Sequence, residues 1–399
     1  MTPREALRAP LRVLCLAHAF PRDDRDPVGL FVLQLAQSLR AEGIETRVVA
    51  PGAPGVPMQD TFDGIPVRRY RYAPRALETL AYKGTMGEQV RRSWGARAAF
   101  VGLLAAGLRA ALAEARAHDC DLVHAHWWIP GGLVGVAVSR RCGIPLVTTL
   151  HGSDVRLIGR GVTRRLFGLV AERSTTMTAV SSWLAGAAER SGGRPVQVAP
   201  MPVRAADFTP GPESRAPRLL FVGKLTEQKG LHFLLAALAR CRSRPTLEVV
   251  GAGRVDDAPL RALADRLGLT DRILWSPILP QPALARRYRE VAALVIPAID
   301  EGLGLTAVEA ALSETPVIAF ASGGLIDCVQ DGETGLLVPP GDIDALAAAI
   351  DRLMEDPARA VQMGKAGRIL ALSRFSERVV ASTYAGIYRS AASLYQTSD

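Results

Sequence analysis

The chain has 399 residues, enough for two domains of ordinary size, and 48% of them are hydrophobic. Its longest apolar runs, such as 291–299, are shorter than the roughly 20 residues of a membrane-spanning helix, and the apolar stretch 13–19 lacks a signal-peptide cleavage site. We therefore expect a cytoplasmic protein rather than an integral membrane protein or an exported one.

Positive charge is concentrated in the first half of the chain. Residues 1–200 contain 26 Lys and Arg against 16 Asp and Glu, a net of +10, whereas residues 201–399 contain 22 against 23. Part of the excess lies among aromatic residues, at Arg68, Arg69, Arg71, Arg75, Lys83, Arg91, Arg92 and Arg97. Two interpretations stay open: a solvated face, or a surface that attaches the protein peripherally to an anionic membrane. We expect no nucleic-acid partner.

Short β-branched or leucine-rich runs alternate with helical patterns along the whole chain, which is typical of parallel sheets covered by helices. In the first half, strands are predicted at 11–17, 45–50, 65–70, 121–125, 145–150, 176–180 and 195–199. The proline-rich stretch 199–217 predicts a linker. Beyond it, strands are predicted at 218–222, 246–250, 272–275, 293–296, 316–320 and 336–338, with a helix at about 304–312 and a long final helix from 376.

These elements predict an α/β fold of two Rossmann-like doubly wound domains. The first comprises residues 1–200 together with the C-terminal helix, 376–399, which crosses back to it. The second comprises residues 205–375. We expect the domains to face each other across a cleft, because ligands of such sheets bind outside the carboxyl ends of the strands.

The strongest local signal is the segment 296–309, in which a strand is followed by a glycine-containing turn and a helix. Such a turn directs backbone N–H groups and the positive helix end at one point, which suits a phosphate. Glu301 can accept hydrogen bonds from sugar hydroxyls, and Glu309 can hold the hydroxyls of a ribose. Between them lie Gly302, Leu303, Gly304 and Leu305. The segment predicts a nucleotide-sugar site; the alternative is a helix cap and a solvated glutamate.

The spacing of Glu301 and Glu309 matches the E-x7-E motif of retaining glycosyltransferases of the GT-B fold, and the chain resembles glycosyltransferase family four in particular. Phe221–Gly230 (FVGKLTEQKG), Gly323–Gly324 and Asp331–Asp342 (DGETGLLVPPGD) resemble neighbouring segments of that family. The resemblance extends over almost all of residues 201–375 and, more loosely, over the first half.

This resemblance implies that the loop after Gly223 holds the donor diphosphate through Lys224 and Lys229. Two cations there would offset the charge of the leaving group without a metal ion or another cofactor. Relatives more often have arginine at position 224, and lysine cannot make the same bidentate contact to phosphate. In the first half, the loop 18–29 resembles one that approaches the donor phosphate, with Gly29 as the matching residue, although relatives usually have a glycine pair.

Histidines follow two predicted strands of the first domain. His151, in the segment HGSD that ends at Asp154, resembles the family's loop after a central strand and is our candidate near the reacting centre. His126 is expected to line the acceptor side, as is Asp154. A structural role is the alternative for His151 and His126, and it is the expectation for His124. Zinc is disfavoured, because His124, His126 and Cys120 have no fourth ligand at suitable spacing.

Three other patterns do not indicate a metal ion or a nicotinamide cofactor. Asp24–Asp26 and Asp119–Asp121 spell the D-x-D of metal-dependent sugar transferases, but the first lies in a charged loop and the second precedes a buried strand. Gly251-Ala252-Gly253 follows a strand, but Asp256 replaces the third glycine of a dinucleotide fingerprint.

The sequence therefore predicts a retaining, metal-independent hexosyltransferase that uses a nucleoside diphosphate sugar. The acceptor is expected to be a glycan, a lipid-linked molecule or a small molecule, as in polysaccharide or glycolipid biosynthesis. Two alternatives stay open: a nucleotide-sugar epimerase or phosphorylase on the same fold, and a non-catalytic subunit that binds sugar nucleotides.

Overall fold

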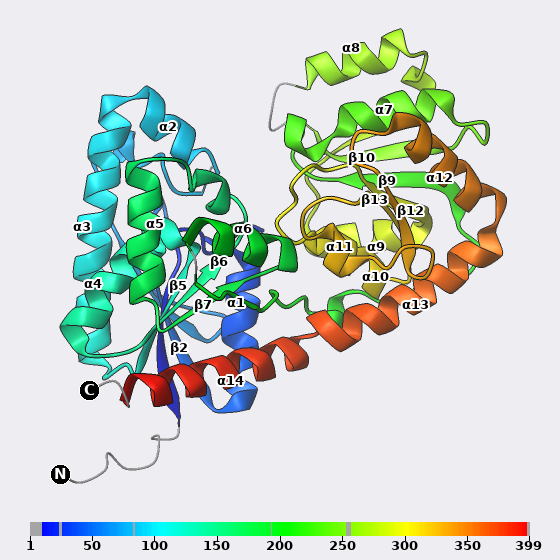
Figure 1. The fold of residues 1–399 in the computed structure, drawn as a ribbon. Coiled ribbons are helices and arrows are strands. Elements are labelled where there is room, and N and C mark those ends of the chain that lie inside the picture. Colours follow the sequence, from blue (N-terminus) through cyan, green and yellow to red (C-terminus); the bar gives the residue numbers. More distant parts are fainter. Residues whose placement is uncertain (1–9, 24–25, 83, 193, 253–256, 397–399) are drawn as a thin grey trace. The chain divides into compact units, whose positions relative to one another are not determined.

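The computed structural model describes residues 10–23, 26–82, 84–192, 194–252 and 257–396. The chain forms two compact units (Figure 1). One contains the chain up to Pro202 together with the residues from Glu377 onward, and the other is Val203–Ser376. Each unit is an α/β fold built on its own sheet, as the alternating pattern predicts.

The first unit is built on an eight-stranded sheet in the order β3-β4-β2-β1-β5-β6-β7-β8. Its strands are β1 (Leu11–Leu16), β2 (Ile44–Pro51), β3 (Gln59–Phe62), β4 (Ile65–Tyr70), β5 (Leu122–His126), β6 (Leu146–Leu150), β7 (Thr176–Ala179) and β8 (Gln197–Val198). All neighbours are parallel except β3 and β4. The direction of the strand order reverses between β1 and β5, so the loops after these strands lie at the usual ligand site of such a sheet.

Seven of these strands match the predicted ones, and β3 was not predicted. Its four side chains are exposed or only partly buried, so it lacks a buried face to give an alternating pattern. The turn that pairs it with β4 is Asp63-Gly64, with φ of 49° and 78°. An Asp-Gly pair with two positive φ values is typical of a tight β-hairpin and was the available signal.

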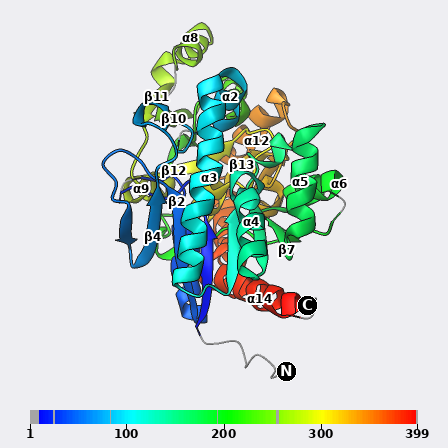
Figure 2. The same ribbon diagram turned by 90° about the vertical axis from the view of Figure 1, so that its left-hand side faces the viewer.

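Helices cover both faces of this sheet. They are α1 (Leu30–Ser38), α2 (Met86–Arg92), α3 (Trp94–Ala117), α4 (Leu133–Cys142), α5 (Val162–Arg173), α6 (Ser182–Gly192) and α14 (Glu377–Gln396). α3, α4 and α5 pack in a row on one face, while α1 packs with α14 on the other (Figures 1 and 2). α14 therefore returns to the first unit, as predicted, and Tyr384 and Tyr388 on it are fully buried.

The second unit contains a parallel six-stranded sheet in the order β11-β10-β9-β12-β13-β14. Its strands are β9 (Ala216–Val222), β10 (Thr246–Ala252), β11 (Ile273–Pro277), β12 (Val291–Ile296), β13 (Val317–Phe320) and β14 (Gly335–Val338). Its helices are α7 (Leu231–Arg240), α8 (Ala258–Arg266), α9 (Gln281–Glu290), α10 (Leu305–Leu312), α11 (Leu325–Cys328), α12 (Ile343–Glu355) and α13 (Pro357–Phe375). All six predicted strands are present, and the strand order reverses between β9 and β12.

The predicted linker contains the boundary between the units, but it is packed rather than solvated. Phe208 is fully buried, and its carbonyl accepts a hydrogen bond from Arg368 at 3.0 Å. Val203 pairs with Ser376 in an isolated β-bridge. Prolines favour the extended backbone of this segment. The buried side chain of Phe208 packs the segment into the second unit.

Among the described helices, α3 is the one that is long and apolar enough to cross a membrane, by length and composition alone. Counting uninterrupted apolar runs did not anticipate this, because single arginines and glycines divide the helix. Its inner side belongs to the first unit, where Leu103 and Ala111 are fully buried. The helix is thus a packed element with one outward face.

Candidate active site

Two neighbouring loops of the second unit carry most of the predicted donor-site residues. They follow β9 and β12, which lie side by side. The N–H of Ile299 donates to the carbonyl of Gln228 at 2.9 Å, and Gln228 Nε2 donates to the carbonyl of Asp300 at 3.1 Å. Lys229 Nζ donates to Glu301 Oε2 at 2.6 Å. The lysine loop and the first glutamate of the motif therefore form one structure.

Glycines permit this close approach. Gly230 has a φ of 70°, and a Cβ there would overlap the carbonyl oxygen of Pro297. Gly323 has a φ of 63°, and a Cβ there would overlap the backbone of Glu301. Gly324 N–H donates to the carbonyl of Glu301 at 2.8 Å. The Gly-Gly pair recognised in the sequence thus holds the backbone of the glutamate.

The Lys229 and Glu301 side chains are partly open to solvent, with 28% and 15% of their surface exposed. They lie beside the start of α10, where Gly304 is the N-terminal cap with a φ of 94°. The first N–H groups of a helix have no partner within it and carry a partial positive charge. A cation, a carboxylate acceptor and a helix N-terminus therefore meet at one place.

The other donor-site residues surround this place. Gly223 directly follows β9, and its N–H donates to the carbonyl of Val250 at 3.1 Å. Lys224 follows and is exposed, and its carbonyl accepts from Thr226 at 2.8 Å. In the turn before α10, Leu303 is buried whereas Gly302 is partly exposed. Leu305 is the first residue of α10.

Glu309 has a partner that the sequence did not indicate. Tyr288, fully buried on α9, donates its hydroxyl to Glu309 Oε2 at 2.8 Å. Burial raises the pKa of Glu309 to about 7, and the Tyr288 hydrogen bond opposes that rise. Glu309 is consequently neither a solvated glutamate nor a permanently ionised one, and its charge changes near neutral pH.

In the first unit, histidines from three neighbouring strands come together. β1, β5 and β6 are adjacent, and His18, His126 and His151 lie at or just beyond their carboxyl ends. His126 Nδ1 and His151 Nε2 are 3.0 Å apart and share a hydrogen bond. Burial lowers the pKa of His18 to about 4 and holds those of His126 and His151 well below the usual value. The cluster is therefore uncharged at neutral pH.

His124 has the structural role that the sequence predicts for it. Its Nε2 lies 2.7 Å from Thr149 Oγ1, and its Nδ1 lies 2.7 Å from the hydroxyl of Tyr388 on α14. Its ring also lies 4.1 Å from that of His126, centroid to centroid. The C-terminal helix thus supports the histidine cluster through His124.

Asp154 positions a loop rather than facing an acceptor. Its side chain is buried, and Oδ1 accepts from the N–H groups of His151 and Gly152 at 3.0 Å each. Oδ2 accepts from the Trp128 N–H at 3.1 Å, and the Trp128 indole donates to the Asp154 carbonyl at 2.7 Å. With both carboxylate oxygens occupied, Asp154 orients the backbone that carries His151.

Trp127 packs within this cluster, beside His126 in the sequence. Its φ is 64°, which a bulky residue adopts only under strain. Its ring centroid lies 4.2 Å from that of His18 and 4.5 Å from that of His151, and Phe31 lies 5.1 Å from His151. Strained residues of this kind cluster at functional sites, so the aromatic group marks the carboxyl ends of β1 and β5.

Gly29 lies in the loop between β1 and α1. It caps α1 with a φ of 77°, and a Cβ there would overlap the carbonyl of Ala19. A single glycine therefore suffices to fold this loop back on itself.

Two ring nitrogens of the histidine cluster are buried without a hydrogen-bond partner within the described residues. They are His18 Nδ1 and His126 Nε2.

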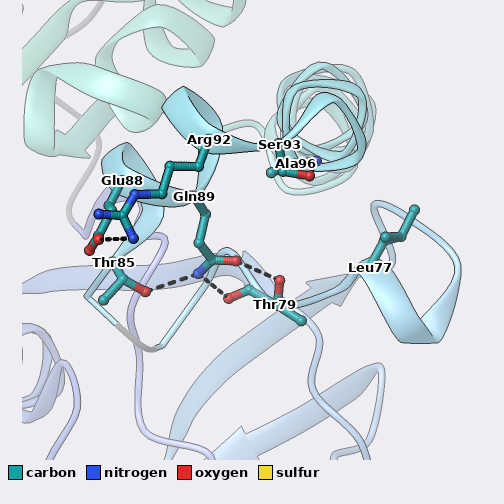
Figure 3. Close-up of a pocket in the computed structure, with 8 residues that line it drawn as sticks. All are labelled: Leu77, Thr79, Thr85, Glu88, Gln89, Arg92, Ser93 and Ala96. Carbon is teal, nitrogen blue, oxygen red and sulfur yellow. Dashed lines mark hydrogen bonds and ion pairs between the residues drawn. The ribbon is translucent and has the colours of Figure 1, made fainter.

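A pocket of about 390 Å³ lies elsewhere in the first unit, where α2 meets α3 (Figure 3). Its polar groups bond to one another: Gln89 Nε2 donates to the Thr79 carbonyl and to Thr85 Oγ1, and Glu88 pairs with Arg92. None of the predicted site residues lines this pocket. Its hydrogen bonds support the α2 turn, and it is not the candidate active site.

The dismissed motifs are only partly described. Asp24 and Arg25, Lys83 of the basic cluster, and Gly253 and Asp256 lie outside the described residues. Asp121 accepts a backbone hydrogen bond from Arg12 at 2.8 Å and so holds β1 beside β5. Within the described ranges, no group of three or more His, Cys, Asp or Glu side chains could hold a metal ion.

Comparison with known proteins gives consistent matches over both units. Residues 204–369 match the family model "Glycosyl transferases group 1", and residues 28–206 match "Glycosyltransferase Family 4". A D-inositol 3-phosphate glycosyltransferase of Acidothermus cellulolyticus is 31% identical, over 96% of this chain and 91% of its own length. One from Streptomyces griseus is 30% identical, over 97% and 90%.

Solved structures share the fold. Sucrose-phosphate synthase from Thermosynechococcus elongatus has a TM-score of 0.80 at 24% identity, with 95% of this chain and 98% of that one covered. Anabaena HepE in complex with UDP and glucose has a TM-score of 0.74 at 20% identity, with 95% and 100% covered. The chain belongs to the group 1, family 4 glycosyltransferases and has their GT-B fold.

Proposed function

We propose that this glycosyltransferase moves a hexosyl group from a nucleoside diphosphate sugar, with retention at the anomeric carbon and without a metal ion or other cofactor. The observation that carries the proposal is the 2.6 Å contact between Lys229 and Glu301 beside the start of α10. In the free protein the glutamate neutralises the lysine. A donor diphosphate would replace the carboxylate as the lysine's partner and release Glu301 to accept hydrogen bonds from the sugar.

Charge development explains how this site would speed the reaction. As the bond to the anomeric carbon breaks, negative charge grows on the leaving diphosphate. Lys229, Lys224 and the first N–H groups of α10 stabilise that charge, and groups fixed in advance do so without reorganisation. Glu309 would hold the ribose. The departing phosphate can take the acceptor proton on the same face, so the mechanism needs no protein nucleophile.

The first unit would supply uncharged hydrogen-bonding groups for the sugar and acceptor hydroxyls. His151, with its lowered pKa, can exchange hydrogen bonds with sugar or acceptor hydroxyls without adding charge. His126 lies behind it as its hydrogen-bond partner. Asp154 would act indirectly, by fixing the loop.

The relatives and neighbours indicate which substrates to test first. Anabaena HepE binds UDP and glucose, so UDP-sugars are the first donors. Several relatives are named D-inositol 3-phosphate glycosyltransferases, so a phosphorylated cyclitol is the first acceptor, before glycans and lipid-linked molecules. We also place the enzyme peripherally at the inner, cytoplasmic membrane face, because of the positive charge of its first half.

The test is release of nucleoside diphosphate from a panel of nucleotide sugars, with and without acceptors. We expect release with one donor, and a loss of about 100-fold or more in Lys229→Ala and in Glu301→Gln. Lys365→Ala is a matched control, because Lys365 forms an ion pair of similar length, 2.8 Å with Glu213, on an exposed surface.

Each rival function gives a different result. A non-catalytic subunit would bind donor without releasing nucleotide, an epimerase would convert the donor with no acceptor, and a phosphorylase would require inorganic phosphate. Release that survives both substitutions would contradict the assigned roles of Lys229 and Glu301.

A further inference from the structure

The structure separates the basic cluster of the first half into two sets. Arg68 binds the buried carboxylate of Glu114, and Arg71 binds that of Glu78. Arg69 is 2% exposed. Arg69 is therefore buried, whereas Arg68 and Arg71 are partly open to solvent but are paired with carboxylates of the fold. The exposed arginines of the cluster that have no such buried partner are Arg75, Arg91, Arg92 and Arg97.

Three of the surface arginines lie at the start of the outward face of α3. Arg91 and Arg92 end α2, and Arg97 lies in the first turn of α3. Exposed residues recur along this helix at intervals of three or four, which makes one stripe. The stripe comprises Trp94, Ala98, Val101, Ala105, Arg109, Ala113 and Arg116, with Arg97 beside its first residue. The one acidic residue of the helix, Glu114, is turned inward to Arg47 and Arg68. The outward face is therefore apolar and basic, without a carboxylate.

The apolar residues of this stripe are unusually open. Trp94 is 81% exposed and Val101 is 65% exposed. The Arg97 guanidinium lies 4.3 Å from the centre of the Trp94 ring, which keeps a cation at the edge of the apolar band. Arg109 and Arg116 form no ion pair within the described residues. Their long side chains can lie along apolar surface while their charges reach a polar layer.

A second helix on the same face repeats this pattern. α5 lies beyond α4 from α3 (Figure 2), and it exposes Val162 and Leu169, at 70% and 40%. Arg164 and Arg165 are exposed between them. α5 also exposes Glu172 and Arg173 at its end. One side of the first unit therefore presents two helices whose outward residues are mostly apolar or basic.

We propose that the outward face of α3, with the end of α2 and the exposed side of α5, is a binding surface for an anionic lipid bilayer. α3 would lie in the plane of the interface, with Trp94 and Val101 among the acyl chains and the arginines among the phosphates. The proposal rests on the peripheral attachment proposed above and names its surface. It requires no spanning segment, because the inner side of α3 stays in the protein core.

A second copy of the chain is the main rival for this face. In a two-fold dimer the same patch meets itself, so Arg97, Arg109 and Arg116 of one copy would face those of the other. The outward face of α3 has no carboxylate to neutralise them. The exposed carboxylates at the edges of the surface are Glu88 on α2, which pairs with Arg92, and Glu172 on α5. An anionic surface satisfies the same charges and covers the apolar residues, so charge complementarity favours the bilayer.

Vesicle sedimentation tests the proposal with the full-length protein. Vesicles of phosphatidylcholine with about a third phosphatidylglycerol should bind it, and phosphatidylcholine alone should not. Trp94→Ser with Val101→Ser should lower the partition coefficient about ten-fold or more. Arg109→Gln with Arg116→Gln should lower it about five-fold per arginine at low salt, and this difference should vanish at high salt.

Matched substitutions elsewhere serve as controls. Leu274→Ser with Ile369→Ser removes apolar side chains that are 52% and 71% exposed in the second unit, and Arg190→Gln with Arg266→Gln removes two exposed arginines. All four variants should keep wild-type nucleotide release. Vesicle binding requires no donor, so its failure leaves the proposed reaction standing, and the reverse also holds.

Three outcomes would overturn the proposal. If the wild-type protein does not sediment with anionic vesicles, the face does not bind a lipid bilayer. Equal loss of binding in the test and control variants excludes this face. Light scattering that shows a dimer dispersed by Trp94→Ser, without vesicle binding, assigns the face to self-association.

Discussion

The two units place opposite kinds of chemistry at equivalent points of their sheets. Where the strand order reverses in the second unit, a lysine and a glutamate pair at 2.6 Å beside a helix N-terminus. At the corresponding point of the first unit, the imidazoles of His18, His126 and His151 are held neutral by burial. The same sheet topology thus provides a charged site in one unit and an uncharged one in the other.

The difference matches the two halves of a glycosyl transfer. A diphosphate leaves with negative charge and requires cations, whereas the hydroxyls of a sugar or an acceptor are neutral. Neutral imidazoles can orient hydroxyls without competing for the diphosphate. Each prediction below tests whether one of the two sites depends on the physical feature that distinguishes it.

The largest effect is expected from Gly230→Ala, which should break the charged site. The new Cβ would overlap the carbonyl of Pro297 and push the Lys229 loop away from Glu301. We expect nucleotide release to fall at least about 100-fold. Gly268→Ala is the matched control, because Gly268 has a similar φ of 67° with nothing near its Cβ. It should cost about 1 kcal/mol of backbone strain and leave turnover unchanged. Equal turnover in the two variants would mean that loop contact is unimportant.

The next effect is expected from Asp154→Asn, which loosens the neutral site. The amide nitrogen that replaces one carboxylate oxygen would face an N–H donor, so one buried hydrogen bond is lost. We expect a fall of about ten-fold or more in kcat, from movement of the His151 loop. Asp351→Asn is the control. The Asp351 carboxylate accepts hydrogen bonds from the N–H groups of Arg242 and Ser243, each at 3.0 Å, and it belongs to neither site. Both variants should lose about 1–3 kcal/mol of stability, and only Asp154→Asn should lose kcat.

The charged site was largely predictable from sequence because its residues are local to two motifs. The sequence itself shows the glycines of the turns, the start of the helix and the spacing of the two glutamates. The order of the strands then brings the two motifs together. The Lys229–Glu301 pair follows from that order. The partner of Glu309 did not follow, because Tyr288 comes from a helix with no chemical motif of its own.

The neutral site was less predictable because it depends on burial and on distant segments. His124 and His126 share one strand, yet one bonds to Tyr388 of the last helix and the other to His151. The positive φ of Trp127 is a property of the backbone, and the identity of the side chain does not predict it. Asp154 looked like an acceptor contact because sequence gives no count of its hydrogen bonds.

A smaller effect, on stability, is expected from the uncharged state of the buried His124 in the first unit. Burial lowers the pKa of His124 to about 3, so below pH 6.5 the unfolded chain binds a proton that the folded protein does not. Stability contributed by His124 is therefore lost as pH falls, by about 2 kcal/mol between pH 7 and pH 5. His124→Gln should flatten the pH dependence of the free energy of unfolding by that amount in denaturant titrations. An unchanged slope would mean that His124 takes up its proton over the same pH range in the folded and the unfolded states.

The smallest effect belongs to Glu309, where burial acts with the opposite sign. Its pKa is raised to about 7, so between pH 4.5 and 7 the folded protein binds a proton that the unfolded chain does not, and stability falls as pH rises. In the proposed role of Glu309, its ionised carboxylate accepts hydrogen bonds from the ribose, so donor affinity should rise through the same range. Tyr288→Phe removes the hydrogen bond that favours ionisation and should move this midpoint upward. We expect calorimetry to show donor binding a few-fold weaker at pH 7 and unchanged at pH 9. A midpoint that stays in place would separate Glu309 from donor binding and leave Lys229 and Glu301 as the charged site.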